Sequence, residues 1–192
     1  MLLDNLSRFK IILASNSPRR RELLAGLGIE YEVKVIPGID ETYPETLKQG
    51  DIPMFISRKK AGAYNVKDNE LIITADTIVW VDSEVLGKPK DTKDAARMLR
   101  LLSGRIHQVY TGVTLTTAEW QRSFVVSSDV EFAELNDEEI NYYIEHYKPF
   151  DKAGAYGIQE WIGYIGVKSI SGSYFNVMGL PVQRLYSELK KI

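Results

Sequence analysis

The sequence contains no cysteine and only two histidines among its 192 residues. The absence of cysteine excludes disulfide bonds, zinc sites built from thiolates and cysteine nucleophiles. The scarcity of histidine argues against a metal centre built from imidazoles. A metal ion bound by this chain is therefore expected on carboxylate oxygens, which are the ligands that Mg²⁺ and Mn²⁺ prefer.

Long apolar runs are also missing from the chain. No stretch approaches the roughly 18 apolar residues that suggest a membrane-spanning helix. The segment Met1 to Ile12 lacks the basic and apolar regions of a signal peptide. We therefore expect a cytoplasmic protein without a membrane partner.

The chain has no excess of positive charge. It carries 24 Lys and Arg against 26 Asp and Glu, a formal net charge of -2. Binding of a nucleic-acid polymer depends on basic residues that displace counterions from its backbone, so we expect no such partner. Small anionic substrates remain compatible with the composition, because a local group of Arg and Lys can make a positive cleft.

A length of 192 residues favours one domain spanning residues 1–192, and two lobes flanking a cleft are the alternative. Apolar and β-branched runs predict strands at Lys10–Ala14, Glu30–Ile36, Leu71–Thr74, Thr77–Val81, Val85–Leu86, Val109–Thr116, Ser123–Phe132, Ile162–Ile170 and Tyr174–Met178. Capping residues and helical periodicity predict helices at Pro18–Leu27, Ile52–Asn65 and Thr92–Leu102, from Asn136 to before Pro149, and from Pro181 to Lys190. This order indicates an α/β protein with a mixed sheet and helices on both faces.

A turn rich in hydroxyl groups follows the first predicted strand. It runs from Ser15 to Pro18 and leads into a helix that begins with three arginines, Arg19 among them. Free backbone amides and the helix dipole favour an anion at such a position, and arginine binds phosphate oxygens with two parallel hydrogen bonds. The turn therefore predicts a phosphate site. The alternative is a serine cap followed by a solvated basic turn, in which the three cations oppose the dipole and need compensation.

Asp76 lies in an otherwise apolar stretch, where an unpaired carboxylate is costly to bury. Three partners suit it: a divalent cation, a lysine, or a water molecule for which the carboxylate acts as general base. A structural role at the end of a strand, with backbone amides as donors, is an equally good interpretation.

Acidic and basic residues elsewhere in the chain are further candidates for binding metal and phosphate. Asp40 and Glu41, in a polar loop, supply oxygen ligands for Mg²⁺ or Mn²⁺, although acidic loop residues are usually only solvated. Lys60 on a predicted helix and Lys88 after a predicted hairpin are candidate phosphate ligands, with exposure to solvent as the alternative.

The segment Asp151 to Gln159 is too rich in small residues for a regular element. Its glycines allow a ligand to approach the backbone closely, and Gln159 offers both an amide donor and an acceptor. This combination suits recognition of a nucleobase edge. The alternative is a tight structural loop in which Asp151 and Lys152 form ion pairs with each other or with neighbours. His107 and the tyrosine-rich Asn141 to Tyr147 carry no motif, so we expect packing or surface roles for them.

Six short blocks together resemble one family over nearly the whole chain. They are Leu13 to Leu24, Gly38 to Glu41, Ala75 to Thr77, Gly87 to Pro89, Asp151 to Gln159 and Gly179 to Pro181. In this order and at these separations the blocks are similar to those of the Maf family of nucleotide pyrophosphatases. The resemblance implies a fold like that of inosine triphosphate pyrophosphatases, with two lobes around a cleft.

The resemblance also implies residue roles. It gives Asp76 as proton acceptor for the hydrolytic water, and Arg19, Thr77 and Gln159 as positions that govern substrate choice. Ser15, Glu41, Lys60 and Lys88 fall on other cleft positions. We therefore expect phosphate contacts from Ser15, Arg19, Lys60 and Lys88, and a Mg²⁺ or Mn²⁺ ion on Glu41 and Asp76.

Two blocks, Ala75–Val79 and Gly154–Gln159, look like the branch of the family that acts on dTTP and UTP, rather than on 7-methylguanosine triphosphate. The resemblance thus implies a house-cleaning enzyme that converts dTTP and UTP, modified pyrimidine triphosphates included, to monophosphate and pyrophosphate. A homodimer follows by family analogy. Two other functions stay open: a nucleotide-binding regulator of septum formation with little catalysis, and a pyrophosphatase for purine or 7-methylguanosine triphosphates.

Overall fold

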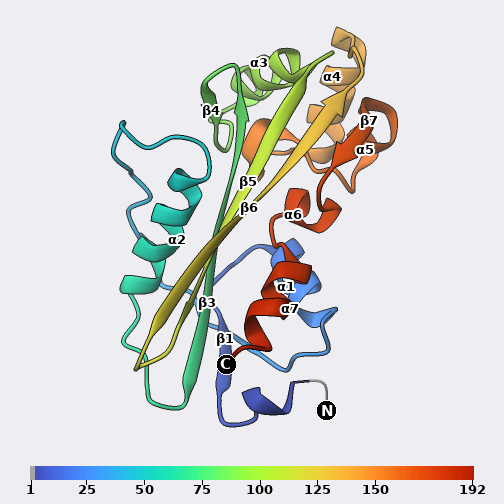
Figure 1. Cartoon of the computed structure of the whole chain (residues 1–192). Coiled ribbons are helices and arrows are strands. Elements are labelled where there is room, and N and C mark those ends of the chain that lie inside the picture. The colour runs from blue at the N-terminus through green and yellow to red at the C-terminus, as the bar shows by residue number, and fades with distance from the viewer. Residues whose placement is uncertain (1–2) are drawn as a thin grey trace. The chain divides into compact units, whose positions relative to one another are not determined.

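The computed structural model describes residues 3–192 and contains one mixed sheet of seven strands in that range (Figure 1). The strand order is β2-β1-β3-β5-β6-β7, and β4 pairs with β3 outside this path. Strand β1 is parallel to both β2 and β3, whereas β3–β4 and β6–β7 are antiparallel pairs. The predicted α/β class with a mixed sheet is confirmed.

The strands are β1 (Lys10–Leu13), β2 (Glu32–Val33), β3 (Glu70–Val81), β4 (Glu84–Leu86), β5 (Ile106–Thr116), β6 (Gln121–Phe132) and β7 (Val167–Ser171). The α-helices are α1 (Pro18–Ala25), α2 (Asp51–Gly62), α3 (Thr92–Leu102), α4 (Asp137–Tyr147), α5 (Trp161–Gly166), α6 (Tyr174–Met178) and α7 (Val182–Leu189). Two 3₁₀ turns, η1 (Asp4–Leu6) and η2 (Ala153–Ala155), complete the set found in residues 3–192.

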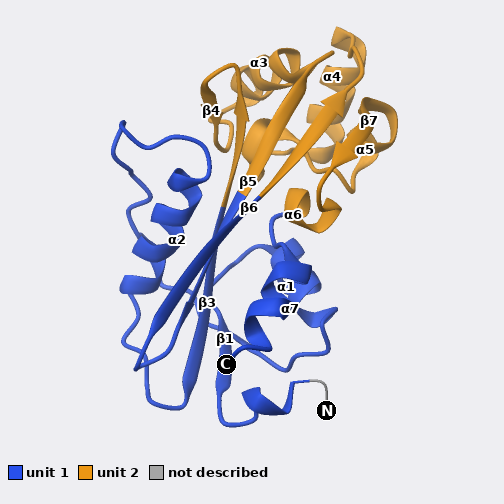
Figure 2. Ribbon diagram, in the orientation of Figure 1, with its two compact units in different colours: residues 1–76, 111–126, 179–192 blue, residues 77–110, 127–178 orange. Residues whose placement is uncertain are grey.

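The chain divides into two compact units (Figure 2). Unit 1 contains residues 1–76, 111–126 and 179–192, and unit 2 contains residues 77–110 and 127–178. The chain passes from one unit to the other within β3, β5 and β6. The single domain expected from the chain length stays a prediction, and each unit is described by itself below.

Helices cover both faces of the sheet in unit 1. The hydroxyl of Ser123 on β6 accepts a hydrogen bond from Arg58 of α2, 2.9 Å away. The neighbouring Phe124 contacts Arg184 of α7, whose guanidinium carbon lies 5.6 Å from the ring centroid. Because successive side chains of a strand point to opposite faces, α2 and α7 lie on opposite sides of β6, as Figure 1 also shows.

Several predicted boundaries follow from local capping. Helix α3 has the predicted bounds, with the Asp91 carboxylate capping its first turn. Helix α4 begins with a complete capping box, in which Asn136 and Glu139 each bond the other's backbone amide. Helix α1 begins at Pro18 behind the Ser17 cap, but it ends at Ala25, two residues short of the prediction.

The strand predictions near the C-terminus were partly wrong. Residues 161–166 form helix α5, so only Val167–Ser171 is a strand, and Tyr174–Met178 is helix α6. These segments are rich in β-branched and aromatic residues, which favour strands when composition alone is considered. Local packing overrides that preference at Gly163, where a Cβ would lie 1.8 Å from the carbonyl oxygen of Ile158, a closeness that only glycine permits. Strand β2 is also shorter than predicted, with two residues rather than seven.

Strand β3 supplies much of the core of unit 1. Leu71, Ile72 and Ile73 are fully buried, and Ile72 packs in a cluster with Ile12 and Tyr64. Asp76 follows on the same strand and is 8% exposed. The burial of this strand therefore fixes the position of the Asp76 carboxylate. None of the helices formed by residues 3–192 has the length and apolar character needed to cross a membrane.

Candidate active site

The turn after β1 is ordered by its own serines. Ser15 is 7% exposed, and its hydroxyl accepts a hydrogen bond from the Ser17 amide over 3.2 Å. The Ser17 hydroxyl accepts from the Arg20 amide over 3.4 Å and caps α1. The predicted turn and helix cap are confirmed, while the role of Ser15 as a phosphate ligand stays a prediction.

Arg20 and Arg21, at the start of α1, donate hydrogen bonds to acceptors of the protein itself. Arg20 donates from Nη1 to the carbonyl oxygen of Ala75 over 2.9 Å, and from Nε to that of Gly179 over 2.8 Å. Arg21 donates to the side-chain oxygen of Asn16 over 3.2 Å. These bonds offset part of the cost of placing the Arg20 and Arg21 cations at a helix start. Arg19 is partly buried on the first turn, and its role in phosphate binding and substrate choice stays a prediction.

The sequence did not predict that Arg20 has a structural role. Three consecutive arginines look alike in a sequence, and nothing in their spacing distinguishes the one that turns toward backbone carbonyls. Burial lowers the pKa of the Arg20 guanidinium, although the nearby Asp76 carboxylate opposes this effect. Because Ala75 directly precedes Asp76, Arg20 ties α1 to the strand segment that carries the carboxylate.

Asp76, Lys60 and Glu41 meet in unit 1. The ammonium of Lys60 lies 2.8 Å from Oδ1 of Asp76 and 3.1 Å from Oε1 of Glu41. The side chains of Lys60 and Asp76 are 15% and 12% exposed, whereas that of Glu41 is 49% exposed. Of the three partners considered for Asp76, the structure shows the lysine. The predicted phosphate ligand Lys60 and the two predicted metal ligands thus form one ionic group.

Helix α2 carries Lys60 and is attached closely to the sheet. The Thr74 hydroxyl donates to the carbonyl oxygen of Ser57 over 2.8 Å, and the Ser57 and Thr114 hydroxyls are 2.8 Å apart. Gly112 of β5 makes room for the start of the helix, since a Cβ there would lie 2.4 Å from the backbone of Pro53 and Met54. These contacts hold α2 where Lys60 can reach the Asp76 carboxylate.

The neighbouring Asp40 has a different role from Glu41. Its carboxylate accepts hydrogen bonds from Lys59, 2.7 Å away, and from both the amide and the hydroxyl of Thr42. The bonds from Lys59 and Thr42 hold the pKa of Asp40 well below its ordinary value. Asp40 therefore fastens the loop to α2, and the adjacent Glu41 contacts Lys60.

Three predicted residues belong to unit 2. Thr77 follows Asp76 on β3 and is partly buried, and Lys88 is exposed after β4. Gln159 is partly buried, and its Oε1 atom is buried without a hydrogen-bond partner among residues 3–192. A buried acceptor without a donor costs about 1–3 kcal/mol, so this atom is suited to a donor on a ligand. The roles of all three residues stay predictions.

The carboxylates fit part of a divalent metal site. No group of three or more His, Cys, Asp or Glu that could hold a metal ion occurs within residues 3–192. Glu41 and Asp76 both contact one nitrogen of Lys60, so two carboxylates converge on one point. Mg²⁺ is often bound by one or two carboxylates together with substrate phosphates and water. The pair thus fits a metal ion that takes its other ligands from a phosphorylated substrate.

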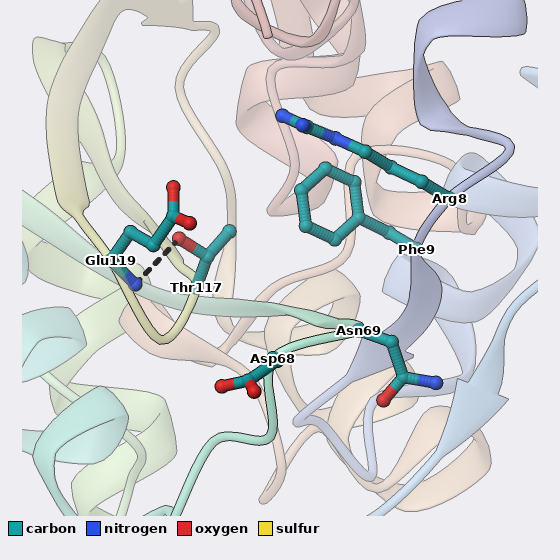
Figure 3. A pocket seen from close by; sticks show the side chains of 6 residues that line it. All are labelled: Arg8, Phe9, Asp68, Asn69, Thr117 and Glu119. Carbon is teal, nitrogen blue, oxygen red and sulfur yellow. Dashed lines mark hydrogen bonds between the residues drawn. The ribbon is translucent and has the colours of Figure 1, made fainter.

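A separate pocket of about 180 Å³ in unit 1 contains none of the predicted site residues (Figure 3). It is lined by Arg8, Phe9, Asp68, Asn69, Thr117 and Glu119. The Arg8 guanidinium stacks on the Phe9 ring at 4.6 Å, and the Glu119 amide donates to the Thr117 hydroxyl over 3.3 Å. We assign no catalytic role to this pocket, because none of the predicted site residues lines it.

Comparison with known proteins shows the family of the chain. The family described as Maf-like protein matches residues 10–192. The dTTP/UTP pyrophosphatase of Phocaeicola vulgatus is 67% identical over 193 residues, with 100% of each chain covered. The protein of the same name from Bacteroides thetaiotaomicron is 62% identical, also over 100% of both chains. The one from Porphyromonas gingivalis strain W83 is 56% identical, covering 98% of this chain and 97% of its own.

Solved structures show the same fold at low sequence identity. The Ham1 protein of Staphylococcus aureus aligns with a TM-score of 0.54 and 18% identity, over 95% of this chain and 98% of its own. A HAM1 protein from Coxiella burnetii aligns with a TM-score of 0.51 and 16% identity, over 96% and 100%. The expectation of an inosine triphosphate pyrophosphatase-like, Maf/Ham1-type fold is confirmed.

Proposed function

The chain belongs to the Maf-like protein family, and from this premise we propose that it is an enzyme that hydrolyses dTTP and UTP to monophosphate and pyrophosphate. The relatives named as dTTP/UTP pyrophosphatases are similar to it from end to end. The structural observation that carries the proposal is the contact of Lys60 with Asp76 and Glu41. A largely buried carboxylate can act as general base for a water molecule within hydrogen-bond reach, and the adjacent lysine offers a positive charge to the phosphates of a substrate.

In the proposed reaction, Asp76 accepts a proton from a water molecule that attacks the α-phosphorus. A bond forms between the water oxygen and this phosphorus, and the bond to the oxygen that bridges the α- and β-phosphorus breaks. Pyrophosphate leaves with the electron pair of that bond. We assign Ser15, Arg19, Lys60 and Lys88 to phosphate binding, and Arg19, Thr77 and Gln159 to substrate choice, on the resemblance to the family.

We propose that Glu41 and Asp76 hold a Mg²⁺ or Mn²⁺ ion when substrate is bound. Such an ion supplies charge neutralisation for the developing pyrophosphate. Lys60 contributes a further positive charge close to both carboxylates. This group therefore combines a base with the cations that a triphosphate requires.

Product analysis in labelled water tests the proposal. The purified protein is incubated with Mg²⁺ and, separately, dTTP, UTP, dCTP, GTP, ITP and 7-methylguanosine triphosphate in H₂¹⁸O. We expect monophosphate and pyrophosphate from dTTP and UTP, with ¹⁸O in the monophosphate because attack is at the α-phosphorus. Label in pyrophosphate, or release of diphosphate and phosphate, contradicts the mechanism. Preference for a purine triphosphate contradicts the substrate, and binding without any turnover favours a regulatory protein.

The Asp76→Asn variant tests the base. Asparagine keeps the shape of the side chain and an oxygen that accepts from Lys60, but it cannot take up the proton. Loss of a general base lowers turnover by about 10²–10⁴-fold, and we expect kcat to fall within this range. The melting temperature serves as the control for folding. Undiminished pyrophosphate release by folded Asp76→Asn protein is the result that rejects this role.

The proposal also includes a cytoplasmic location and a homodimer. Cell fractionation tests the location, and light scattering coupled to size-exclusion chromatography tests the dimer.

A further inference from the structure

Tyr143 is a fully buried side chain of α4 that bonds two points of one loop in unit 2. Its hydroxyl donates to Oε2 of Glu160 in a short hydrogen bond and accepts from the backbone amide of Gly157, 2.9 Å away. Burial, together with the Glu160 carboxylate, raises the pKa of Tyr143 far above its ordinary value. The phenol therefore stays protonated and keeps both bonds across the physiological pH range.

Glu160 is held from a second side by Lys152. The lysine is 7% exposed, and its ammonium lies 3.1 Å from Oε1 of Glu160 and 2.8 Å from Oδ1 of Asp151. This confirms the ion pair that the sequence analysis considered as the structural alternative for the loop. A buried lysine between two carboxylates is costly to disturb, because removal of one partner leaves an uncompensated charge.

The loop has little room to move around Gly157. A Cβ at this position would lie 2.9 Å from the Glu160 carboxyl group and 3.0 Å from Cε of Lys152. The Glu160 amide also donates to the carbonyl oxygen of Gly157 over 2.9 Å, which closes a turn of four residues. Tyr143 thus fixes both ends of the turn from Gly157 to Glu160.

Gln159 stands inside this turn, and its Oε1 atom is buried without a donor among residues 3–192. An oxygen acceptor suits the N3–H group of thymine and uracil, whereas cytosine has an acceptor at the same ring position. A glutamine amide can offer either its oxygen or its nitrogen to a base. Which of the two atoms meets the base depends on the groups around the amide and on the place where the backbone of the turn holds it.

We propose that Tyr143 is the positioning residue for base selection: through Glu160 and the Gly157 amide it fixes the turn from which Gln159 accepts the N3–H of thymine or uracil. This inference rests on the proposed function, because it concerns the pyrimidine substrate of the same enzyme. Tyr143 contacts the loop and not the base, so its effect passes through Gln159. Its removal is expected to change substrate affinity and selectivity rather than the chemical step.

The test compares Tyr143→Phe with a matched control. Phenylalanine keeps the ring and its packing but removes the hydroxyl. We expect KM for dTTP to rise about tenfold or more, as for the loss of a hydrogen bond to a charged group, with kcat changed much less. The ratio of kcat/KM for dTTP to that for dCTP should fall. Tyr147→Phe, at a half-exposed tyrosine of the same helix that stacks on Tyr143, should change neither quantity.

A double-mutant cycle with Gln159→Ala identifies the route of the effect. If Tyr143 acts through Gln159, Tyr143→Phe has no further effect on base selectivity once the glutamine is absent. Additive losses in the double variant overturn the proposal. An unchanged KM and base ratio in folded Tyr143→Phe, with only a lower melting temperature, also overturns it, since Tyr143 is then merely structural.

Two further measurements keep the test decisive. If Tyr143→Phe does not fold, Glu160→Gln weakens the same contacts while keeping the shape, and it should lower the dTTP to dCTP ratio; an unchanged ratio contradicts the inference.

If the wild type hydrolyses no nucleotide, the proposed function fails on its own. Calorimetric binding of the α,β-methylene analogues of dTTP and dCTP then replaces turnover. Equal binding selectivity in wild type and Tyr143→Phe contradicts the positioning role.

Discussion

Lys60 donates a hydrogen bond to Asp76 over 2.8 Å, and both side chains are largely shielded from solvent. The ammonium also contacts Glu41, so it occupies the point at which the two carboxylates converge. A divalent cation held by both carboxylates would compete with this ammonium for their oxygens. We therefore expect metal to bind weakly to the free protein until a triphosphate supplies further ligands.

Replacement of Lys60 by glutamine should expose this competition. Without the ammonium, the two carboxylates lack their counter-ion, so the affinity of the nucleotide-free protein for Mn²⁺ should rise by about tenfold or more. Electron paramagnetic resonance of free Mn²⁺ measures this affinity directly. Lys59→Gln is the matched control, because Lys59 lies on the same helix but pairs with Asp40. Equal Mn²⁺ affinity in wild type and Lys60→Gln contradicts the prediction.

Replacement of Arg20 by lysine and of Arg19 by lysine should affect different properties, chiefly stability for Arg20 and the KM for dTTP for Arg19. Arg20→Lys loses the forked contact with the carbonyl oxygens of Ala75 and Gly179, so we expect it to lower the free energy of unfolding by about 1–3 kcal/mol. Turnover should fall as well, because Ala75 adjoins Asp76. Arg19→Lys should instead raise KM for dTTP several-fold with a smaller change in stability. Urea unfolding and steady-state kinetics of both variants measure the contrast, and equal losses of stability argue against it.

The sequence predicts the fold well where local signals and tertiary structure agree. The caps at Ser17 and Asn136 and the apolar run of β3 gave elements close to those observed. Helices α5 and α6 were missed because their aromatic and β-branched residues favour strands, and because the close backbone approach of Gly163 to Ile158 cannot be deduced from composition.

The residues of the candidate site were predicted from the sequence, but the contacts between them were not. Asp76, Glu41 and Lys60 were all singled out from the sequence, yet nothing in the sequence identified Lys60 as the lysine that contacts Asp76. That contact depends on the packing of α2 against β3 and β5, through Thr74, Ser57 and Gly112. Arg20 and Tyr143 gave no sequence signal, because their contacts lie with residues distant in the chain.

The buried His107 predicts a pH dependence of stability. It is fully buried and bonds the Tyr156 hydroxyl through Nε2 over 2.7 Å, and burial lowers its pKa from 6.5 to about 4. The unfolded chain therefore binds more protons than the folded chain between these values. The neutral ring's contribution to stability is complete above pH 6.5 and is lost as the pH falls toward 4.

Urea unfolding at pH 7 and pH 5 tests this dependence. Between these values His107 should account for a loss of about 2 kcal/mol in the free energy of unfolding. His107→Gln should be less stable at both values, but its loss between pH 7 and pH 5 should be smaller by about that amount. His146→Gln, at the exposed histidine of α4, should keep the wild-type pH dependence. The same loss in His107→Gln as in wild type excludes the assignment to His107.

Gly112 is expected to be the position at which a single methyl group disturbs both stability and turnover. In Gly112→Ala, the new Cβ would lie 2.4 Å from the backbone of Pro53 and Met54, so the start of α2 must move away from β5. Overpacking of this kind costs about 1–3 kcal/mol. Because α2 carries Lys60, the shift should also reduce kcat for dTTP. Gly62→Ala, at an open position of the same helix, has no neighbour within 4 Å and should be neutral or slightly stabilising. Thermal melting and steady-state kinetics of the two variants decide the matter: if Gly112→Ala matches Gly62→Ala in both, the close packing of α2 on β5 does not position Lys60.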